Sequence, residues 1–207
     1  MNRSINTVVG TDGHHRCWWC GHDPLYVNYH DNEWGVPTAD DQKLFEKISL
    51  EGFQAGLSWI TILRKREAFR SAFLDFDYRR VAKFSKRTID RLVVDRSIIR
   101  HRGKIESVVN NARRMKELLE QSRSLSSLLW QFEPARSEPL RSRDEVPGMT
   151  DESDAMSREL KRLGWTFVGP TTCYALMQAV GMVNDHLQNC GMWPHVEQAR
   201  KQFSRPR

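Results

Sequence analysis

The sequence predicts a single domain built almost entirely of α-helices. Apolar residues recur at spacings of three and four along most of the chain, which is the period of a helix with one buried face. Runs of alternating apolar and polar residues, which would indicate strands, are almost absent. At 207 residues the chain is long enough for one good-sized core, or for two small helical lobes that share one.

The first predicted helix begins near Asp40, in the segment DDQKLFEKISLEGFQAGL. Leu44 and Phe45 precede Ile48 by four and three residues, so their side chains share one face of a helix. The acidic residues lie in the first turn, where they interact favourably with the helix dipole. The same period predicts further helices at residues 59–73, 78–84, 86–94, 102–121, 125–132, 153–163 and 171–183.

The remaining segments are polar and carry no helical period. Residues 133–152 contain three prolines among charged residues, which predicts a long surface connection. Residues 1–15 are expected to form a flexible leader, and residues 196–207 a basic tail that contacts DNA or has no fixed structure. The domain itself is expected to span residues 16–195.

Charge and hydropathy restrict the class of protein. The chain has 32 Lys and Arg residues against 26 Asp and Glu, a net charge of +6, which favours a polyanionic partner. No stretch approaches the ~18 consecutive apolar residues of a membrane span, and the N-terminal residues lack the apolar core of a signal peptide. We therefore expect a cytoplasmic protein without a membrane partner.

Two pairs of potential metal ligands lie at opposite ends of the chain. Twelve residues separate Cys17 from His30, and three residues separate His186 from Cys190. Two thiolates and two imidazoles suit a closed tetrahedral Zn²⁺ site. Such a site would join the two ends of the fold, and the metal would contribute to folding.

The cysteines leave alternatives open. Four cysteines are too few and too unevenly placed for a disulfide scaffold, so in a reducing compartment they remain thiols or bind metal. The segment CWWC places Cys20 three residues after Cys17, and His22 follows. A local site that uses Cys17, Cys20 and either His22 or His30 therefore competes with the long-range set. The Cys-x-x-Cys motif can also form a redox pair, and all these residues can be buried or solvated without a metal.

Three separated segments carry a family resemblance. They are RCWWCGHDPLYVNYHDNEWGVP at residues 16–37, LEGFQAGLSWITILRKRE at 50–67 and FVGPTTCYALMQAVGMVNDH at 167–186. They closely resemble, in the same order, the 3-methyladenine DNA glycosylase I family, over about residues 16–190. The resemblance implies a helix-hairpin-helix DNA glycosylase fold. It also implies one structural Zn²⁺, because four protein ligands leave no open position on the metal, held by Cys17, His30, His186 and Cys190.

Residues 153–183 predict a helix, the short turn GWTFVGPT and a second helix, which looks like the helix-hairpin-helix of that superfamily. The backbone amides of Val168, Gly169 and Thr171, at the start of the second helix, could hold a DNA phosphate. The alternative is an ordinary helical hairpin. The basic segment IIRHRGKIE, which includes Arg102 and Lys104, could add phosphate contacts or be a solvated face.

The resemblance also assigns a base pocket. It implies that Glu51 is the catalytic residue, whose carboxylate hydrogen-bonds the base edge, and that Leu57 is a wedge that fills the gap left in the duplex. Without the resemblance, Glu51 is an ordinary surface residue and Leu57 a core residue. Gly169 is the implied DNA contact in the hairpin. The aromatic side chains implied to stack on the extruded base belong to Trp19, Tyr26, Tyr29 and Trp59.

The implied function is base excision repair by a monomer that removes 3-methyladenine from alkylated double-stranded DNA and releases the free base. The methylated base is cationic on its sugar and leaves as a neutral molecule, so hydrolysis needs no acid. No lysine stands in the motifs as an amine nucleophile, so we expect base removal without strand cleavage. Asp185 directly precedes His186 and is not assigned a catalytic role. The alternatives are a zinc-stapled helical DNA-binding protein without catalytic activity and a metal-dependent hydrolase.

Overall fold

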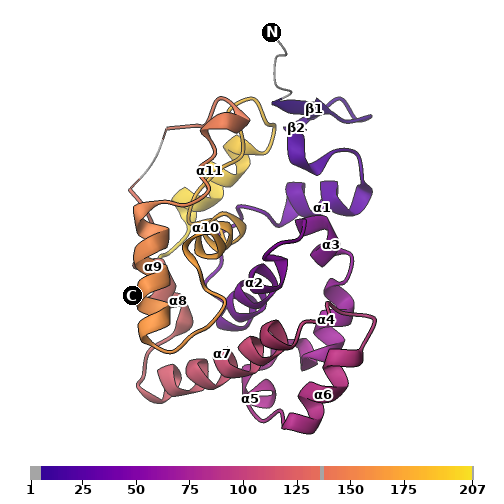
Figure 1. The fold of residues 1–207 in the computed structure, drawn as a ribbon. Helices are drawn as coiled ribbons and strands as arrows, with labels where there is room; N and C mark the ends of the chain where they lie inside the picture. Colours follow the sequence, from indigo (N-terminus) through magenta and orange to yellow (C-terminus); the bar gives the residue numbers. More distant parts are fainter. Residues whose placement is uncertain (1–5, 136–137, 207) are drawn as a thin grey trace.

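The computed structural model describes residues 6–135 and 138–206. It is a mostly helical fold with a two-stranded antiparallel sheet near the N-terminus, which confirms the predicted fold class (Figure 1). No helix in these described ranges is long and apolar enough to cross a membrane. In chain order the elements are β1 (Thr7–Val9), β2 (His15–Cys17), a 3-10 helix η1 (Trp18–Cys20), α1 (Pro24–Asn32), α2 (Asp41–Gln54), α3 (Trp59–Leu63), α4 (Arg66–Ala72), η2 (Leu74–Phe76), α5 (Tyr78–Val81), α6 (Lys86–Val94), α7 (Arg102–Glu120), α8 (Leu125–Trp130), η3 (Arg143–Glu145), α9 (Asp151–Arg162), α10 (Pro170–Ala179) and α11 (Trp193–Gln202).

Helix α2 lies at the centre of the molecule, between the group α3 to α7 and the group α8 to α11 (Figure 1). Asp40 caps it: the carboxylate accepts hydrogen bonds from the backbone amides of Gln42 and Lys43. Helices α3, α7, α8 and α10 all pack against it, so its Leu44 and Phe53 side chains are completely buried. One continuous hydrophobic core therefore extends from α2 into both groups.

Several predicted helices are shorter in the structure, α5 and α8 by two or three residues at the C-terminal end, and two differ more. The predicted helix at residues 59–73 is divided into α3 and α4, because Lys65 leaves the helical conformation with φ −103° and ψ 2°. Helix α10 ends at Ala179, where a helix was predicted to continue to residue 183. Gly181 stops it with φ +76°, and a side chain there would meet the Gly35 carbonyl at 2.5 Å. The chain thus turns where only glycine fits.

The expected flexible leader differs from the structure. Of its residues, 1–5 lie outside the described chain, whereas Thr7–Val9 pairs with His15–Cys17 as an antiparallel hairpin. A partly buried ion-pair network fixes this hairpin, because the Arg16 guanidinium binds both the Asp12 and the Asp31 carboxylates. Asp31 belongs to α1, so the hairpin is attached to the helical fold. Short strands of three residues carry too little alternation to be recognised in a sequence.

The C-terminal part also differs from the expected basic tail. Helix α11 covers residues 193–202, and its Val196 side chain is buried. Arg200 is only 8% exposed and donates a hydrogen bond to the Met182 carbonyl, so this basic residue is used within the fold. The predicted surface connection at 133–152 passes close to the same region. There the Leu140 carbonyl accepts a hydrogen bond from Gln188, and η3 lies within the connection.

Candidate functional site

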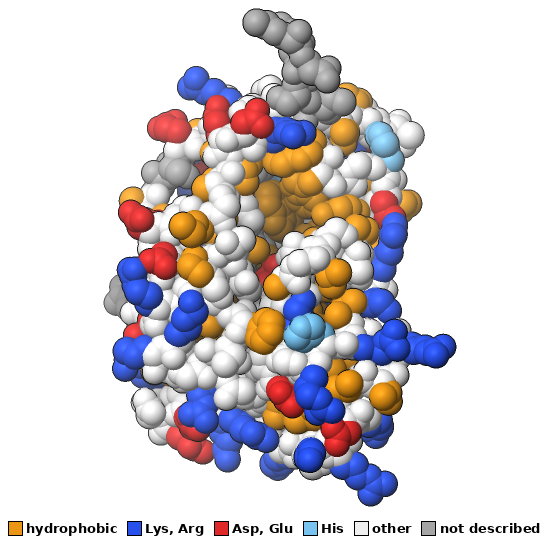
Figure 2. Space-filling model, viewed as in Figure 1, with side chains coloured by type: hydrophobic (Ala, Val, Ile, Leu, Met, Phe, Trp, Pro, Cys, Tyr) orange, Lys and Arg blue, Asp and Glu red, His pale blue; other side chains and the backbone are white. Residues whose placement is uncertain are grey.

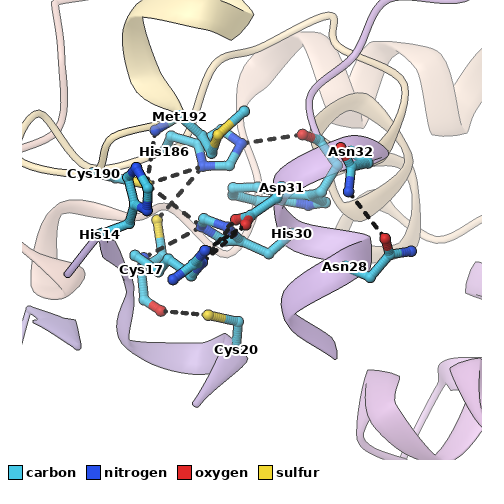
Figure 3. Close-up of polar contacts among 12 residues, drawn as sticks. His14, Cys17, Cys20, Asn28, His30, Asp31, Asn32, His186, Cys190 and Met192 are labelled. Carbon is cyan, nitrogen blue, oxygen red and sulfur yellow. Dashed lines mark hydrogen bonds and ion pairs between the residues drawn. The ribbon is translucent and has the colours of Figure 1, made fainter. Parts of the chain in front are cut away.

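The four potential metal ligands from the two ends of the chain meet at one buried point (Figure 3). Their ligand atoms lie within 4.8 Å of one another, and each residue is at most 2% exposed. His186 Nδ1 lies 3.8 Å from the Cys17 sulfur and 3.5 Å from the Cys190 sulfur, and His30 Nε2 lies 3.5 Å from the Cys190 sulfur. Tetrahedral bonds of ~2.3 Å to sulfur and ~2.0 Å to nitrogen separate the two kinds of donor by about 3.5 Å. This cluster could therefore hold a metal ion.

The outer contacts of the two histidines orient their free nitrogens toward the cluster. His30 Nδ1 lies 2.7 Å from an Asp31 carboxylate oxygen, and His186 Nε2 lies 3.1 Å from the Trp34 carbonyl. Burial pushes the pKa of Asp31 upward, but hydrogen bonds from Arg16 and His30 outweigh it and leave the pKa lowered. A carboxylate or carbonyl behind a histidine is the usual support of a metal ligand, because it fixes the ring and its tautomer.

Each of the two sulfurs accepts a backbone amide hydrogen bond, which would stabilise a thiolate ligand. The Leu187 amide donates to the Cys17 sulfur at 3.4 Å, and the Met192 amide donates to the Cys190 sulfur at 3.5 Å. Cys20 is not part of this group, because its thiol donates to the Cys17 carbonyl at 3.3 Å. His22 is exposed, and the cluster in the described residues does not contain it. The structure thus favours the ligand set from the two chain ends over the local alternative.

A cavity of about 210 Å³ lies beside the metal cluster. Figure 2 shows a hollow on this face of the molecule, lined mainly by hydrophobic side chains. Because pockets for drug-sized ligands measure ~300–1,000 Å³, this one suits a single small heterocycle. The residues that line it are Trp18, Trp19, Tyr26, Tyr29, Trp34, Glu51, Gln54, Trp59, Val146, Ala175, Gln178 and Asp185.

The four aromatic residues expected at the base site all line this cavity. The rings of Trp19 and Tyr26 lie 4.9 Å apart between centroids, and those of Tyr29 and Trp59 lie 5.3 Å apart. Tyr26 and Tyr29 come from successive turns of α1, as their spacing of three predicted. Burial raises the pKa of Tyr26 to about 12, so its hydroxyl stays protonated. The aromatic part of the cavity wall is therefore uncharged.

Glu51 supplies the carboxylate of the cavity and is not the surface residue that its type alone would suggest. It lies on the last turn of α2 and is 4% exposed. Burial raises its pKa to about 8, and only the charge of Lys47 opposes this shift. Within the described part of the chain no side chain or amide donates a hydrogen bond to it, so its oxygens face the cavity without a partner.

Two further lining residues, Trp34 and Asp185, have no role predicted from the sequence. Trp34 both lines the cavity and stacks edge-on against His186, with 4.7 Å between centroids, so it links the cavity to the metal cluster. Asp185 also faces the cavity, and its carboxylate accepts hydrogen bonds of 2.7 Å from Tyr174 and Gln178. Burial raises the pKa of Asp185. No local spacing relates these residues, although the run HDNEW already places Trp34 four residues after His30.

Leu57 lies at the rim of a second, smaller cavity that also touches Glu51. Its side chain is 40% exposed, so it is not the core residue that composition alone favours. It follows Gly56, which turns the chain after α2 with φ +79°. Lys104, for which a phosphate contact or a solvated position was considered, supports this turn: its ammonium donates to the carbonyls of Phe53 and Ala55. A large apolar side chain is thus held out in solvent on a fixed turn.

Helices α9 and α10 form the expected hairpin, and Leu57 and the start of α10 border the same small cavity. Gly169 is the N-cap of α10 and provides no side-chain cap. Its φ of −65° suits any residue, and a side chain there would meet nothing within 4 Å, so the fold itself does not require a glycine at this position. Pro170 and the exposed Thr171 follow it on the open side of the turn.

The structure combines a helical hairpin, an exposed apolar side chain on a glycine turn, and an aromatic cavity with a buried carboxylate. These features are those expected of a protein that binds one planar base. Comparison with known proteins makes this specific. The family model of methyladenine glycosylase matches residues 19–193. DNA-3-methyladenine glycosylase 1 of Escherichia coli is 48% identical over 181 residues, which cover 86% of this chain and 97% of the relative.

Solved structures agree with this similarity. A crystal structure of 3-methyladenine DNA glycosylase I (TAG) matches with a TM-score of 0.83 and 47% identity, and covers 85% of this chain and 98% of its own. A variant of 3-methyladenine DNA glycosylase I in complex with 3-methyladenine matches with a TM-score of 0.82 and 35% identity, over 86% of this chain and 97% of its own. The chain belongs to the methyladenine glycosylase family.

Proposed function

We propose that this protein extrudes 3-methyladenine from alkylated double-stranded DNA and removes it by hydrolysis of the N-glycosidic bond. The observation that carries the proposal is the buried, unpartnered carboxylate of Glu51 at the end of an aromatic cavity. A buried carboxylate without a partner is costly, and a ligand with a positive charge and N–H donors would offset that cost. The similar glycosylases support the same activity.

Selectivity follows from the charge of the damaged base. While attached to the sugar, 3-methyladenine is cationic, and electron-rich rings such as Tyr26, Tyr29 and the Trp residues attract a stacked cation. Glu51 adds an opposite charge and hydrogen-bond acceptors. Neutral adenine would gain neither the attraction to the aromatic rings nor the attraction to Glu51, and it would leave the carboxylate poorly paired. The site therefore discriminates partly by disfavouring adenine.

The reaction is a hydrolysis at the sugar. The C1′–N bond breaks and its electron pair goes to the cationic base, which leaves neutral, while a water oxygen bonds to C1′ and its proton passes to solvent. The protein contributes extrusion, positioning and stabilisation of the positively charged sugar. The cavity lining contains no lysine, and the nearby Lys47 nitrogen is completely buried, so we expect base removal without strand cleavage.

The DNA contacts lie around the mouth of the cavity. We assign Leu57 as the wedge that fills the gap in the duplex, because it is apolar, exposed and adjacent to the cavity that contains Glu51. We assign the turn at Gly169 to a DNA phosphate, because it presents the start of α10 without a side-chain cap and without steric cover. Basic side chains are scattered over the same face of the molecule (Figure 2).

We assign the cluster of Cys17, His30, His186 and Cys190 to one structural Zn²⁺. Four buried protein donors leave no position for a catalytic water, which argues against a metal-dependent hydrolase. Since one chain supplies the cavity, the hairpin and the metal ligands, we propose a monomer. Its free cysteines suit the reducing cytoplasm, where we place it.

The decisive test is release of 3-methyladenine from alkylated duplex DNA by the purified protein. We expect the free base to appear while the strands remain intact. Glu51→Gln should fold and still act, but it should lose part of its preference for 3-methyladenine over adenine, by somewhat under tenfold, because a charged hydrogen bond exceeds a neutral one by ~1 kcal/mol. If wild-type protein binds the duplex but frees no base, the non-catalytic DNA-binding alternative is correct.

A further inference from the structure

Lys47 is a buried lysine directly beneath the wall of the proposed base site. It precedes Glu51 by one turn of α2, so the two side chains lie on the same face of the helix. Its side chain is 15% exposed, and its nitrogen is completely buried. Within the described residues this nitrogen makes no hydrogen bond. An ammonium in such a place costs several kcal/mol, whereas an apolar side chain would fill the space at no such cost.

The surroundings of the Lys47 nitrogen connect it with the cavity wall. It lies 4.6 Å from the centroid of the Tyr29 ring and 5.8 Å from that of Trp59, two rings that line the cavity. Lys47 itself is not among the lining residues, so its charge acts on the site from behind these rings. The ammonium is therefore placed to influence the site without touching a bound base.

Two carboxylates share the charge of Lys47. Glu33 Oε2 lies 3.8 Å away, too far for a hydrogen bond, and the Glu33 carboxylate is already held by Arg66 through two bonds of 2.5 and 2.9 Å. Glu51, in contrast, has no other cation that lowers its pKa. Glu33 is thus the nearer carboxylate but also has Arg66 as a partner, whereas Lys47 is the cation among the described residues that lowers the pKa of Glu51.

We infer that Lys47 is a positioning residue of the base site, whose ammonium favours the charged form of Glu51 that would receive a cationic base. The inference rests on the proposed glycosylase function. It assigns to Lys47 an action through Glu51 alone, with no contact to substrate.

The electrostatic surroundings are consistent with this role. The charged groups that act on Lys47 are Glu33, Glu51, Glu46 and Arg66, and burial is the main cause that lowers its pKa. On Glu51, burial raises the pKa to about 8 and Lys47 alone lowers it, while the neutral hydroxyls of Tyr26 and Tyr29 add no charge. Removal of the ammonium must therefore raise the pKa of Glu51 further, and a larger fraction of the carboxyl groups would be protonated at neutral pH.

The test compares Lys47→Met with a matched control, Lys43→Met, which removes an exposed lysine one turn earlier on the same helix. The rate of 3-methyladenine release from duplex DNA and the affinity for free 3-methyladenine are measured across pH. For Lys47→Met we expect the acid limb of both profiles to move upward by ~1 pH unit, with a several-fold loss at neutral pH and recovery at alkaline pH. Lys43→Met should follow the wild type, and Lys47→Arg should restore most of the profile.

A second background separates an electrostatic role from a structural one. In Glu51→Gln, which cannot ionise, Lys47→Met should leave the pH profile unchanged. An unshifted profile of Lys47→Met in the wild-type background, or an equal shift in both backgrounds, would overturn the inference. If Lys47→Met does not fold, Lys47→Gln serves in its place. Failure of the wild type to release base would instead overturn the proposed function, so the two failures are distinguishable.

Discussion

The metal-ligand cluster and the aromatic cavity lie on either side of Trp34. They differ in whether their polar groups have hydrogen-bond partners within the protein. In the cluster, each histidine has an outer partner and each sulfur accepts a backbone amide. In the cavity, the carboxylate of Glu51 and the indole nitrogen of Trp59 have no hydrogen-bond partner among the described residues, and neither has the Lys47 ammonium behind the cavity wall. Polar groups whose hydrogen bonds are all made within the protein form a rigid structural site. Buried polar groups without partners can form hydrogen bonds with a ligand.

The difference also explains why the two sites adjoin. The rings of Trp19 and Trp34 line the cavity, and they contact His30 and His186 at centroid distances of 5.1 and 4.7 Å. A metal that fixes the two histidines would also fix these two walls. The metal-ligand cluster thus supports the shape of the cavity, whose unpaired polar groups carry an energetic cost.

Removal of both sulfur ligands should have the largest effect, because it removes the metal from the cluster. We expect the variant Cys17→Ala, Cys190→Ala to lose its zinc and several kcal/mol of unfolding free energy, because binding of a structural metal is part of the free energy of folding. Elemental analysis and thermal unfolding measure the two effects. Cys20→Ala, beside the cluster but outside it, should retain the metal. Zinc that remains bound to the double variant would contradict the ligand assignment.

At the cavity, the same logic predicts a gain in stability when a charge is removed. The pKa of Glu51 is about 8 in the folded protein and 4.5 at its ordinary value, so between these pH values the folded state binds more protons than the unfolded state. Stability of the wild type should therefore fall as pH rises through this window. Glu51→Gln should remove this fall and be more stable than the wild type at pH above about 8, by several kcal/mol and at most about 5 kcal/mol. Denaturant unfolding across pH checks this; parallel curves for both proteins would show that Glu51 ionises normally.

The support of the metal cluster can be loosened without loss of a ligand. Asp31→Asn should weaken metal binding by ~10–100-fold, because the carboxylate behind His30 fixes the ring and increases its basicity. Competition with a chelator measures the affinity. Asp12→Asn, whose side chain is 46% exposed and touches the cluster only through Arg16, should have a smaller effect. Equal affinities for Asp31→Asn and wild type would mean that the outer contact is dispensable.

The smallest effect concerns the rim of the cavity. Leu57→Gly should weaken binding to a duplex with an abasic analogue by roughly tenfold, which corresponds to burial of part of one leucine side chain in the DNA. Thermal stability should change little, because the side chain is already exposed. Val94→Gly, at an exposed position on α6, is the control. Unchanged affinity after Leu57→Gly would show that Leu57 is not a wedge.

Much of the helical fold was predictable because its causes are local. The prediction for residues 86–94 coincides with α6, and α7 and α8 begin at the predicted residues, where His101 and Ser124 cap them. The segment 59–73 was wrong as one helix because both α3 and α4 carry the apolar period, and nothing local reveals the break at Lys65. The end of α10 depends on the close approach of Gly181 to Gly35, which are far apart in sequence.

The sequence by itself determined the helical class, the four potential metal ligands and, through the family resemblance, the identity of the pocket residues. Only the tertiary structure decided which of them meet and in what state. It brings Cys17 and Cys190 together, excludes Cys20, exposes Leu57 and uses Lys104 to support a turn instead of a phosphate. The physical reason is that burial and charge pairing depend on neighbours contributed by other parts of the chain. The pKa of Glu51, which rises to about 8 because helices close around it, is a property of the fold and not of the residue.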